Sequence, residues 1–237
     1  LYDGAVVNTA YLGLGEYSAK SGDIYQYGGT MNVSAASWNF RIGHYPSETS
    51  TYYLNGGTLN SLNGNVSIGW DGTGRLIITN GTANLIGIQL DSNGQSSVPD
   101  LLQLSGSGVL AIGANGLLGA GAGGPQAVNF GGGTVSALTN WTAYNSQNIN
   151  LTNITGTTTF DPGPHTITAE CALFGTGGLI KSGAGRLMLN GASTYTGDTR
   201  VNAGNLWGTG SANGTTVYVV SGGTMGPANA ATLGAFT

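Results

Sequence analysis

A short turn motif recurs between Gly28 and Val135 at nearly constant spacing. Each copy places small residues before Thr or Gly and an apolar residue, and the positions after the turn are 30, 58, 82, 108 and 134. Successive copies are therefore separated by about 26 residues, which without a helical pattern is typical of one coil of a β-solenoid. We predict an all-β chain that folds as a β-solenoid of roughly nine coils of about 26 residues.

The strands of one coil can be placed from the alternation of apolar and polar residues. They are expected at 53–55, 58–60 and 65–69, with the core-facing side chains Leu54, Leu59, Val66 and Ile68. An antiparallel sandwich or barrel is the rival fold, because Asn-Gly pairs such as Asn55-Gly56 are strong hairpin signals. In a solenoid the same pairs would lie at corners, where Gly tolerates positive φ. The regular period favours corners.

The composition excludes several classes of protein. Gly accounts for 44 of the 237 residues, only 7% are charged, and the net charge is −4. Without a basic cluster, nucleic-acid binding is not expected. No apolar run reaches the ~20 residues of a membrane-spanning helix. Cys171 is the single cysteine, so no intrachain disulfide can form, and a buried apolar role is expected for it.

The repeat suggests three regions along the chain. Residues 1–21 are a candidate N-terminal cap or divergent coil, residues 22–160 are solenoid coils, and residues 161–237 continue the solenoid. The register becomes irregular near residue 160, where a change of coil shape or a subdomain boundary is expected. The chain begins at Leu1 and not at Met, so we expect a processed form or a fragment.

The stretch 174–208 carries a pattern of Gly, Leu and Lys at alternate positions, followed by Thr194-Tyr195-Thr196-Gly197 and a short strand. From Gly175 to Trp207 it resembles the autotransporter-associated β-strand repeat of bacterial passenger domains; the matching residues are Gly175, Gly177, Leu179, Lys181, Gly183, Gly185, Leu187, Leu189, Gly191, Thr199, Val201, Gly204 and Leu206. Ser193 and Asn205 depart from the pattern. The resemblance implies a right-handed parallel β-helix that is exported to the cell surface or beyond, and a repeat without catalytic residues. Lys181 and Asp198 are expected to be surface charges.

No constellation of catalytic residues stands out. Glycoside hydrolysis requires two carboxylates roughly 5–10 Å apart, and Asp71 with Asp91 or Asp100 is the best candidate pair, with Arg75 as the only basic residue nearby. Solvated acids in turns are the simpler interpretation. His44 and His165 have no companion cluster, so ordinary polar or stacking roles are expected. We predict no catalytic, cofactor-binding or metal-binding residues and no cofactor.

Aromatic residues and sequons supply the remaining hints. Trp38, Tyr45, Tyr52 and Trp70 lie in the first coils and could form a surface that stacks on glycans or docks a neighbouring subunit, although core packing is the simpler explanation. Sequons for N-glycosylation occur at Asn32, Asn65, Asn80, Asn140, Asn150, Asn153 and Asn213.

These features predict a non-enzymatic, secreted, bacterial structural or adhesive β-solenoid. It would act as a cell-surface scaffold or as the subunit of an extracellular filament assembled by end-to-end or lateral contacts. The expected partners are sister subunits, or extracellular matrix and glycans, with no nucleic acid. The alternative is a polysaccharide-binding or polysaccharide-cleaving β-helix protein.

Overall fold

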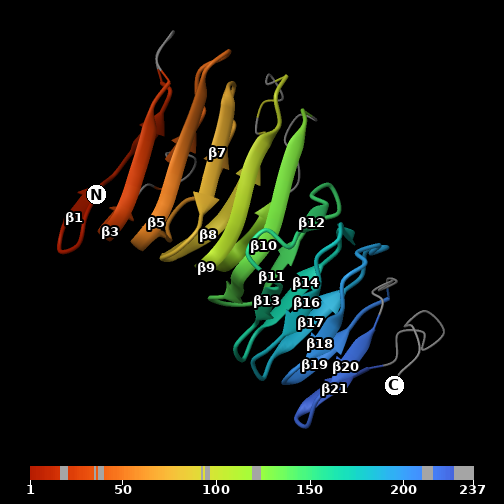
Figure 1. Ribbon diagram of the computed structural model, residues 1–237. Helices are drawn as coiled ribbons and strands as arrows, with labels where there is room; N and C mark the ends of the chain where they lie inside the picture. The colour runs from red at the N-terminus through yellow and green to blue at the C-terminus, as the bar shows by residue number, and fades with distance from the viewer. Residues whose placement is uncertain are drawn as a thin grey trace.

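The computed structural model describes residues 1–16, 21–34, 36, 40–91, 93, 97–118, 124–209 and 216–226. All regular secondary structure within these ranges is β-strand, with no helix (Figure 1). The strands are β1 (Val6–Thr9), β2 (Leu12–Leu14), β3 (Asp23–Val33), β4 (Phe40–Ile42), β5 (Thr49–Ser61), β6 (Val66–Ile68), β7 (Thr73–Ile78), β8 (Thr82–Leu90), β9 (Asp100–Leu118), β10 (Gln126–Ala137), β11 (Trp141–Ala143), β12 (Ile149–Leu151), β13 (Thr158–Asp161), β14 (Thr166–Ala169), β15 (Leu173–Phe174), β16 (Leu179–Lys181), β17 (Arg186–Leu189), β18 (Thr199–Val201), β19 (Gly204–Trp207), β20 (Val217–Val219) and β21 (Gly223–Met225).

The strands stack side by side from one end of the molecule to the other, as Figure 1 shows. Every pairing between the described strands is parallel, and each strand pairs with strands one coil before or after it. Antiparallel hairpins would pair consecutive strands in opposite directions. The prediction of an all-β parallel solenoid is therefore confirmed, and the sandwich alternative is wrong.

The coils present three faces, which we call A, B and C. Long strands bend across a corner and contribute to two or three faces. Face A contains parts of β3, β5, β7, β9, β10, β12 and β15. Face B contains parts of β1, β3, β5, β8, β9, β10, β13, β16, β18 and β20. Face C contains β2, β4, β6, parts of β8 and β9, β11, β14, β17, β19 and β21.

The predicted turn motif marks the corner between faces A and B. Thr30, Thr58 and Thr82 are register partners on face B, and the ladder continues through Val109 to Thr134. At the fourth copy of the motif, the residue in register is therefore Val109 and not Gly108, the position expected from the sequence. At Gly57 the backbone has φ +74°, and an added Cβ would lie 2.3 Å from the Gly29 carbonyl oxygen. This corner consequently requires Gly both for its left-handed backbone and for the close approach of the preceding coil.

The coil length is not uniform, which corrects the prediction of roughly nine equal coils. On face B the register ladder from Thr30 to Thr159 advances by about 24–28 residues at each step. The ladder then continues to Ile180, Arg200 and Tyr218, and each of these steps takes only about 18–21 residues. The regular strands of face A end with β15, so the three-sided coil completes about six turns.

Irregular chain replaces the strand of face A in the later coils. The backbone N–H groups of Thr194 and Thr196 still donate hydrogen bonds to the carbonyls of Leu173 and Gly175, at 2.7 and 2.9 Å. The connection, residues 190–198, remains tied to the coil before it without forming a regular strand. We call the coils of residues 23–151 the wide coils and those of residues 158–225 the narrow coils.

The core is a continuous apolar column inside the solenoid. The four side chains predicted to face inward, Leu54, Leu59, Val66 and Ile68, are all fully buried. Each buried aliphatic side chain contributes about 1.5–3 kcal/mol relative to an exposed one. At the junction of the wide and narrow coils, Phe130 and Phe160 pack edge to face with centroids 6.4 Å apart. The column therefore passes from the wide to the narrow coils without interruption.

Candidate functional site

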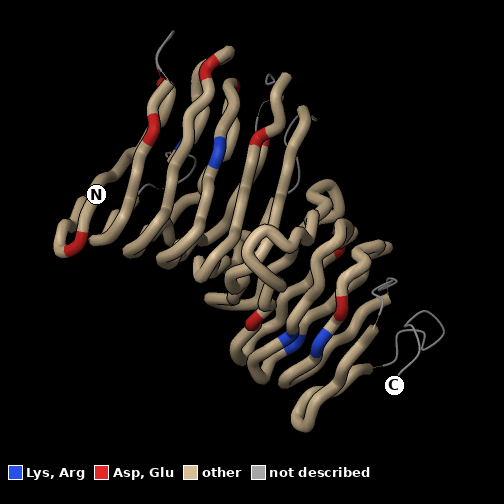
Figure 2. Tube along the Cα trace, in the orientation of Figure 1, with Lys and Arg blue, Asp and Glu red and all other residues tan. Residues whose placement is uncertain are grey.

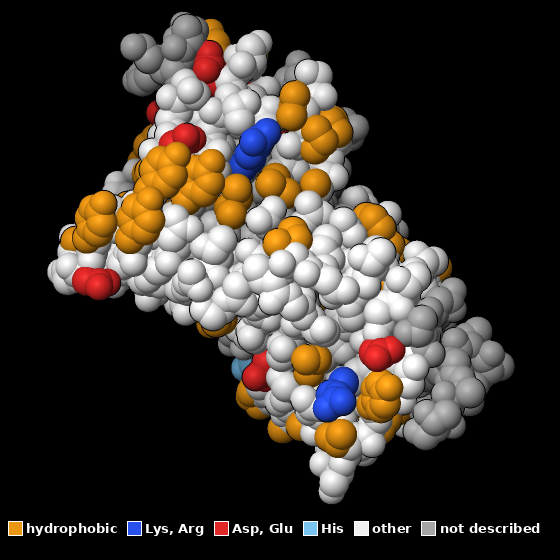
Figure 3. Space-filling model, in the orientation of Figure 1, with side chains coloured by type: hydrophobic (Ala, Val, Ile, Leu, Met, Phe, Trp, Pro, Cys, Tyr) orange, Lys and Arg blue, Asp and Glu red, His pale blue; other side chains and the backbone are white. Residues whose placement is uncertain are grey.

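The most distinctive surface feature is a stack of tyrosine rings on the N-terminal coils. Tyr25 and Tyr53 are register partners on face A, and their ring centroids lie 4.6 Å apart with an interplanar angle of 7°. The Tyr27 centroid lies 6.5 Å from that of Tyr25, and the Tyr2 centroid lies 5.5 Å from that of Tyr27. We call Tyr2, Tyr25, Tyr27 and Tyr53 the tyrosine row. Figure 3 shows hydrophobic side chains gathered in a row across these strands.

The orientation of these rings limits what the tyrosine row can bind. Tyr2 is 70% exposed, and Tyr25 and Tyr27 are about half exposed. Because the neighbouring rings stack on one another, their faces are partly covered. Stacking on a sugar requires a free ring face. The tyrosine row is therefore better suited to edge contacts with a protein surface.

The aromatic residues singled out from the sequence occupy different places. Tyr45 is exposed, and Trp70 is half-buried beneath the Arg41 guanidinium, which lies 4.2 Å from the centre of its ring. Tyr52 is fully buried, and its hydroxyl donates to Gln26 Oε1 at 2.6 Å, so it cannot belong to a surface strip. Trp38 lies outside the described residues. Of the tyrosine row, only Tyr53 belongs to the aromatic cluster that the sequence indicates in the first coils; Tyr2, Tyr25 and Tyr27 were not predicted, although Tyr25 lies one period before Tyr53.

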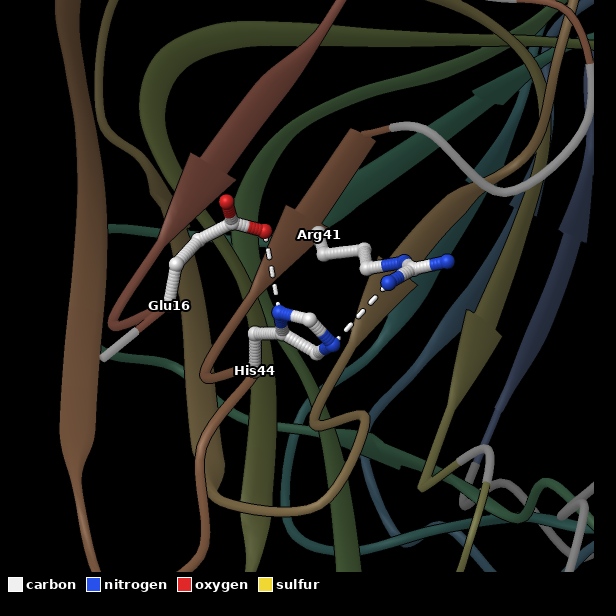
Figure 4. A network of polar contacts seen from close by, with 3 residues as sticks. All are labelled: Glu16, Arg41 and His44. Carbon is white, nitrogen blue, oxygen red and sulfur yellow. Dashed lines mark hydrogen bonds and ion pairs between the residues drawn. The ribbon is translucent and has the colours of Figure 1, made fainter. Parts of the chain in front are cut away.

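A polar network joins the first turns on the side of face C. His44 Nδ1 lies 2.9 Å from Glu16 Oε1, and Arg41 Nη1 lies 2.9 Å from His44 Nε2 (Figure 4). Since Arg can only donate, His44 Nε2 accepts this bond and Nδ1 carries the proton that it donates to Glu16. The ring also packs edge to face on Trp70. Both imidazole nitrogens are therefore engaged, so the network ties neighbouring coils together and leaves no free base.

The acids considered for glycoside hydrolysis lie around one inserted loop. Asp91 and Asp100 are buried, and their charges interact, whereas Asp71 accepts a hydrogen bond from Asn93 Nδ2 at 2.9 Å. Burial raises the pKa of Asp100 to about 7, with a smaller contribution from the charge of Asp91. Asp100 Oδ1 accepts from Gly74 N at 2.7 Å, and its Oδ2 has no hydrogen-bond partner in the described part of the chain. Asp91 and Asp100 are therefore not the solvated turn acids expected from the sequence.

Charged residues are few and scattered along the chain (Figure 2). Lys181, expected at the surface, is fully buried. Its Nζ donates to the carbonyl oxygens of Ser182, Gly183 and Ala203 at 2.5, 2.8 and 3.1 Å. Desolvation lowers the pKa of Lys181 to about 8, although the charge of Asp161 opposes this shift. The expectation was wrong because the ammonium group is the donor that satisfies the carbonyls of a tight corner.

Comparison with known protein families identifies the segment that contains Lys181. Residues 179–207 match the passenger-associated-transport-repeat. This match confirms the resemblance seen in the sequence, and the parallel solenoid fits an autotransporter passenger-type β-helix. No curated protein and no solved structure matches the chain. The passenger repeat begins at β16 and ends at β19, so it lies entirely within the narrow coils.

The sequons lie both inside and outside ladders of asparagine side chains. Asn32 takes part in a ladder in which Asn32, Asn60 and Asn84 each donate to the preceding Asn at 2.8 Å. Asn65 accepts from Asn115, and Asn150 donates to Asn129. The side chains of Asn80, Asn140 and Asn153 are exposed, and Asn213 lies outside the described residues. Glycan attachment would therefore disrupt ladder contacts at Asn32, Asn65 and Asn150 only, among the described sequons.

In the ranges that the structure describes, no group of three or more His, Cys, Asp or Glu side chains has the geometry to hold a metal ion. The same ranges contain no helix long and apolar enough to cross a membrane. Cys171 is buried, and burial raises the pKa of its thiol to about 12, which agrees with an apolar packing role.

Proposed function

We propose that this chain is a non-enzymatic, passenger-type scaffold that is secreted or displayed at the bacterial cell surface. The passenger-associated-transport-repeat at 179–207 supports export, because its family implies a secreted or cell-surface protein. The ladder of parallel strands from β1 to β21 supports a mechanical role. Backbone hydrogen bonds shared between successive coils would make the solenoid stiff along its axis.

The tyrosine row carries the second part of the proposal, which is lateral contact with a sister copy. Aromatic side chains are enriched in protein interfaces, and a clustered exposed group of them marks an interaction site. Asp23 is exposed on β3 beside Tyr25, and Arg75 is its register partner two coils further along the same face. In a two-fold arrangement of two copies, Asp23 of one copy would face the partner's Arg75 across the stacked rings.

Sedimentation velocity over a wide concentration range tests the lateral contact. We expect concentration-dependent association of the unmodified chain and loss of association in the double variant Tyr25→Ser/Tyr53→Ser. Tyr218→Ser, on the narrow coils, is the matched control and should associate normally. Charge reversal at Arg75→Asp should weaken association, and the swap Asp23→Arg/Arg75→Asp should restore it. A chain that stays monomeric at every concentration contradicts the proposal.

The non-enzymatic part of the proposal rests on the acid cluster. Asp91 and Asp100 are buried, and Asp100 lacks the solvent-facing position that a general acid needs to reach a glycosidic oxygen. Incubation with neutral and acidic polysaccharides should release no reducing ends and no unsaturated products. Product that disappears in Asp100→Asn would show instead that the chain is a polysaccharide-cleaving enzyme.

A further inference from the structure

A hollow of about 570 Å³ opens on face A where the wide coils end. Its volume falls within the ~300–1,000 Å³ range of small-molecule sites. The start of β10, the loop before β12, and the end of β15 form its walls; the polar and aromatic lining residues are Gln126, Asn129, Ser146, Gln147, Asn148, Asn150 and Phe174. None of its lining residues carries a charge. The sequence had drawn attention only to Asn150, as a sequon.

The amides of the hollow are arranged so that donors and an acceptor remain available. Asn150 Nδ2 donates to Asn129 Oδ1 at 3.1 Å, which leaves the Asn129 amide nitrogen without a partner among the described residues. Gln147 is buried, and its Nε2 donates to Gln126 Oε1. Gln147 Oε1 has no partner within the described ranges, but this atom is fully buried beneath the wall of the hollow. The half-buried side chains of Asn129 and Asn150 therefore offer the ligand a donor, Asn129 Nδ2, and an acceptor, Asn150 Oδ1.

Phe174 supplies an apolar platform beside these amides. Asn129, Asn150 and Phe174 are successive register partners and occupy the same outward column of face A. Phe174 is 40% exposed, and no other aromatic ring among the described residues packs against it. It therefore differs from the tyrosine row, in which the rings partly cover one another's faces. A sugar ring offers an apolar C–H face and hydroxyl groups at its edge, which matches an aromatic platform flanked by amides.

We propose that this hollow binds a neutral saccharide. Phe174 lies under one sugar ring, and the amides of Asn129 and Asn150 bind its hydroxyl groups. An acidic sugar would bring a carboxylate to a site without a Lys or Arg partner, so uronic acids are excluded. The proposal is independent of self-association, because the tyrosine row lies on the first coils and the hollow lies at the last strands of face A.

Saturation-transfer NMR and calorimetry test the proposal on the unmodified chain. The neutral probes are hexasaccharides of glucose, mannose, galactose and N-acetylglucosamine, and the acidic probe is a galacturonic acid hexasaccharide. We expect at least one neutral probe to bind with a millimolar or tighter Kd and the acidic probe not to bind. Phe174→Ala should weaken binding at least tenfold. Tyr218→Ala, an equally exposed aromatic residue on face B, is the matched control and should bind normally.

A second variant keeps the test decisive if Phe174→Ala perturbs the fold. Ser146→Trp places a large ring in the mouth of the hollow from an exposed loop position and should abolish binding without changing the thermal unfolding. No binding of any neutral probe, equal binding of the acidic probe, or unchanged binding by both variants would each overturn the proposal. Loss of saccharide binding with self-association intact would leave the scaffold function standing.

Discussion

The wide and narrow coils close the same kind of parallel solenoid with different lengths of chain. The wide coils use about 24–28 residues a turn and contain a strand on each of three faces. The narrow coils use about 18–21 residues a turn, and those after β15 replace the strand of face A with a short connection. The apolar core continues through both regions. The length of a turn therefore depends on how face A is built, and not on the core.

In each region a buried polar side chain donates hydrogen bonds to the backbone carbonyls at a tight corner. This side chain is a neutral amide in the wide coils and an ammonium group in the narrow coils. In the wide coils, Gln26 Nε2 donates to the carbonyls of Gly28, Gly29 and Thr58. In the narrow coils, Lys181 Nζ takes the same role toward three carbonyls of its own corner. An amide does this without a charge, whereas an ammonium group must be desolvated. The comparison predicts that the narrow coils depend on pH through Lys181, and the wide coils through their buried acid, Asp100.

The largest effect is expected where the two regions meet. Phe160→Ala removes a fully buried ring that packs on Phe130 and should destabilise the chain by about 3–5 kcal/mol. Denaturant unfolding followed by circular dichroism measures the loss. Phe174→Ala removes the same side chain from an exposed position and should cost under about 0.5 kcal/mol. If Phe160→Ala and Phe174→Ala lower the free energy of unfolding equally, the core does not run continuously through the junction.

Asp100 should make the wide coils less stable as the pH rises. Its pKa is raised from 3.8 to about 7 in the folded chain, so the folded state holds the proton more tightly than the unfolded state. Its contribution is fully present below pH 3.8 and is lost as the pH rises through about 7. The stability of wild type minus that of Asp100→Asn should fall by about 2–4 kcal/mol across this window. If this difference in stability does not change with pH, Asp100 is in contact with water in the folded chain.

Lys181 should act in the opposite direction at higher pH. Its folded pKa is lowered from 10.5 to about 8, so the unfolded state binds more protons between these values and stability rises with pH. Lys181→Met removes this rise and leaves three carbonyls without their donor, at a cost of about 1–3 kcal/mol at neutral pH. Arg200→Met, at an exposed site, is the control. If the stability of Lys181→Met still rises with pH between about 8 and 10.5, the rise does not come from Lys181.

The sequence predicted the parts of the fold that rest on local patterns. Leu54, Leu59, Val66 and Ile68 were placed in the core because strand alternation is strict, and three of the motif threonines stack as expected. The passenger repeat was recognised from its Gly and Leu spacing.

Other features depend on contacts between residues far apart in the chain. The irregular register near residue 160 indicated a change of coil shape, but the shorter period of the narrow coils could not be predicted because the recurring turn motif ends at Val135. Lys181 was assigned to the surface because charged side chains are rarely buried, and nothing local shows that three carbonyls converge on its ammonium group. The hollow beside Phe174 was missed for the same reason, since its amides meet only when Gln126, Gln147 and Asn150 are brought together by the coil.

Disulfide trapping of register pairs tests the change of coil length most directly. Ile180 and Arg200 are register partners on face B. In a chain with Cys171→Ala, the pair Ile180→Cys/Arg200→Cys should oxidise rapidly, because adjacent parallel strands hold their Cα atoms within the range of roughly 4.4–6.8 Å that a disulfide requires. The pair Phe174→Cys/Arg200→Cys, which a uniform coil of about 26 residues would place in register, should not form a disulfide. Rapid oxidation of the second pair and not the first, read by mass spectrometry, would contradict the account.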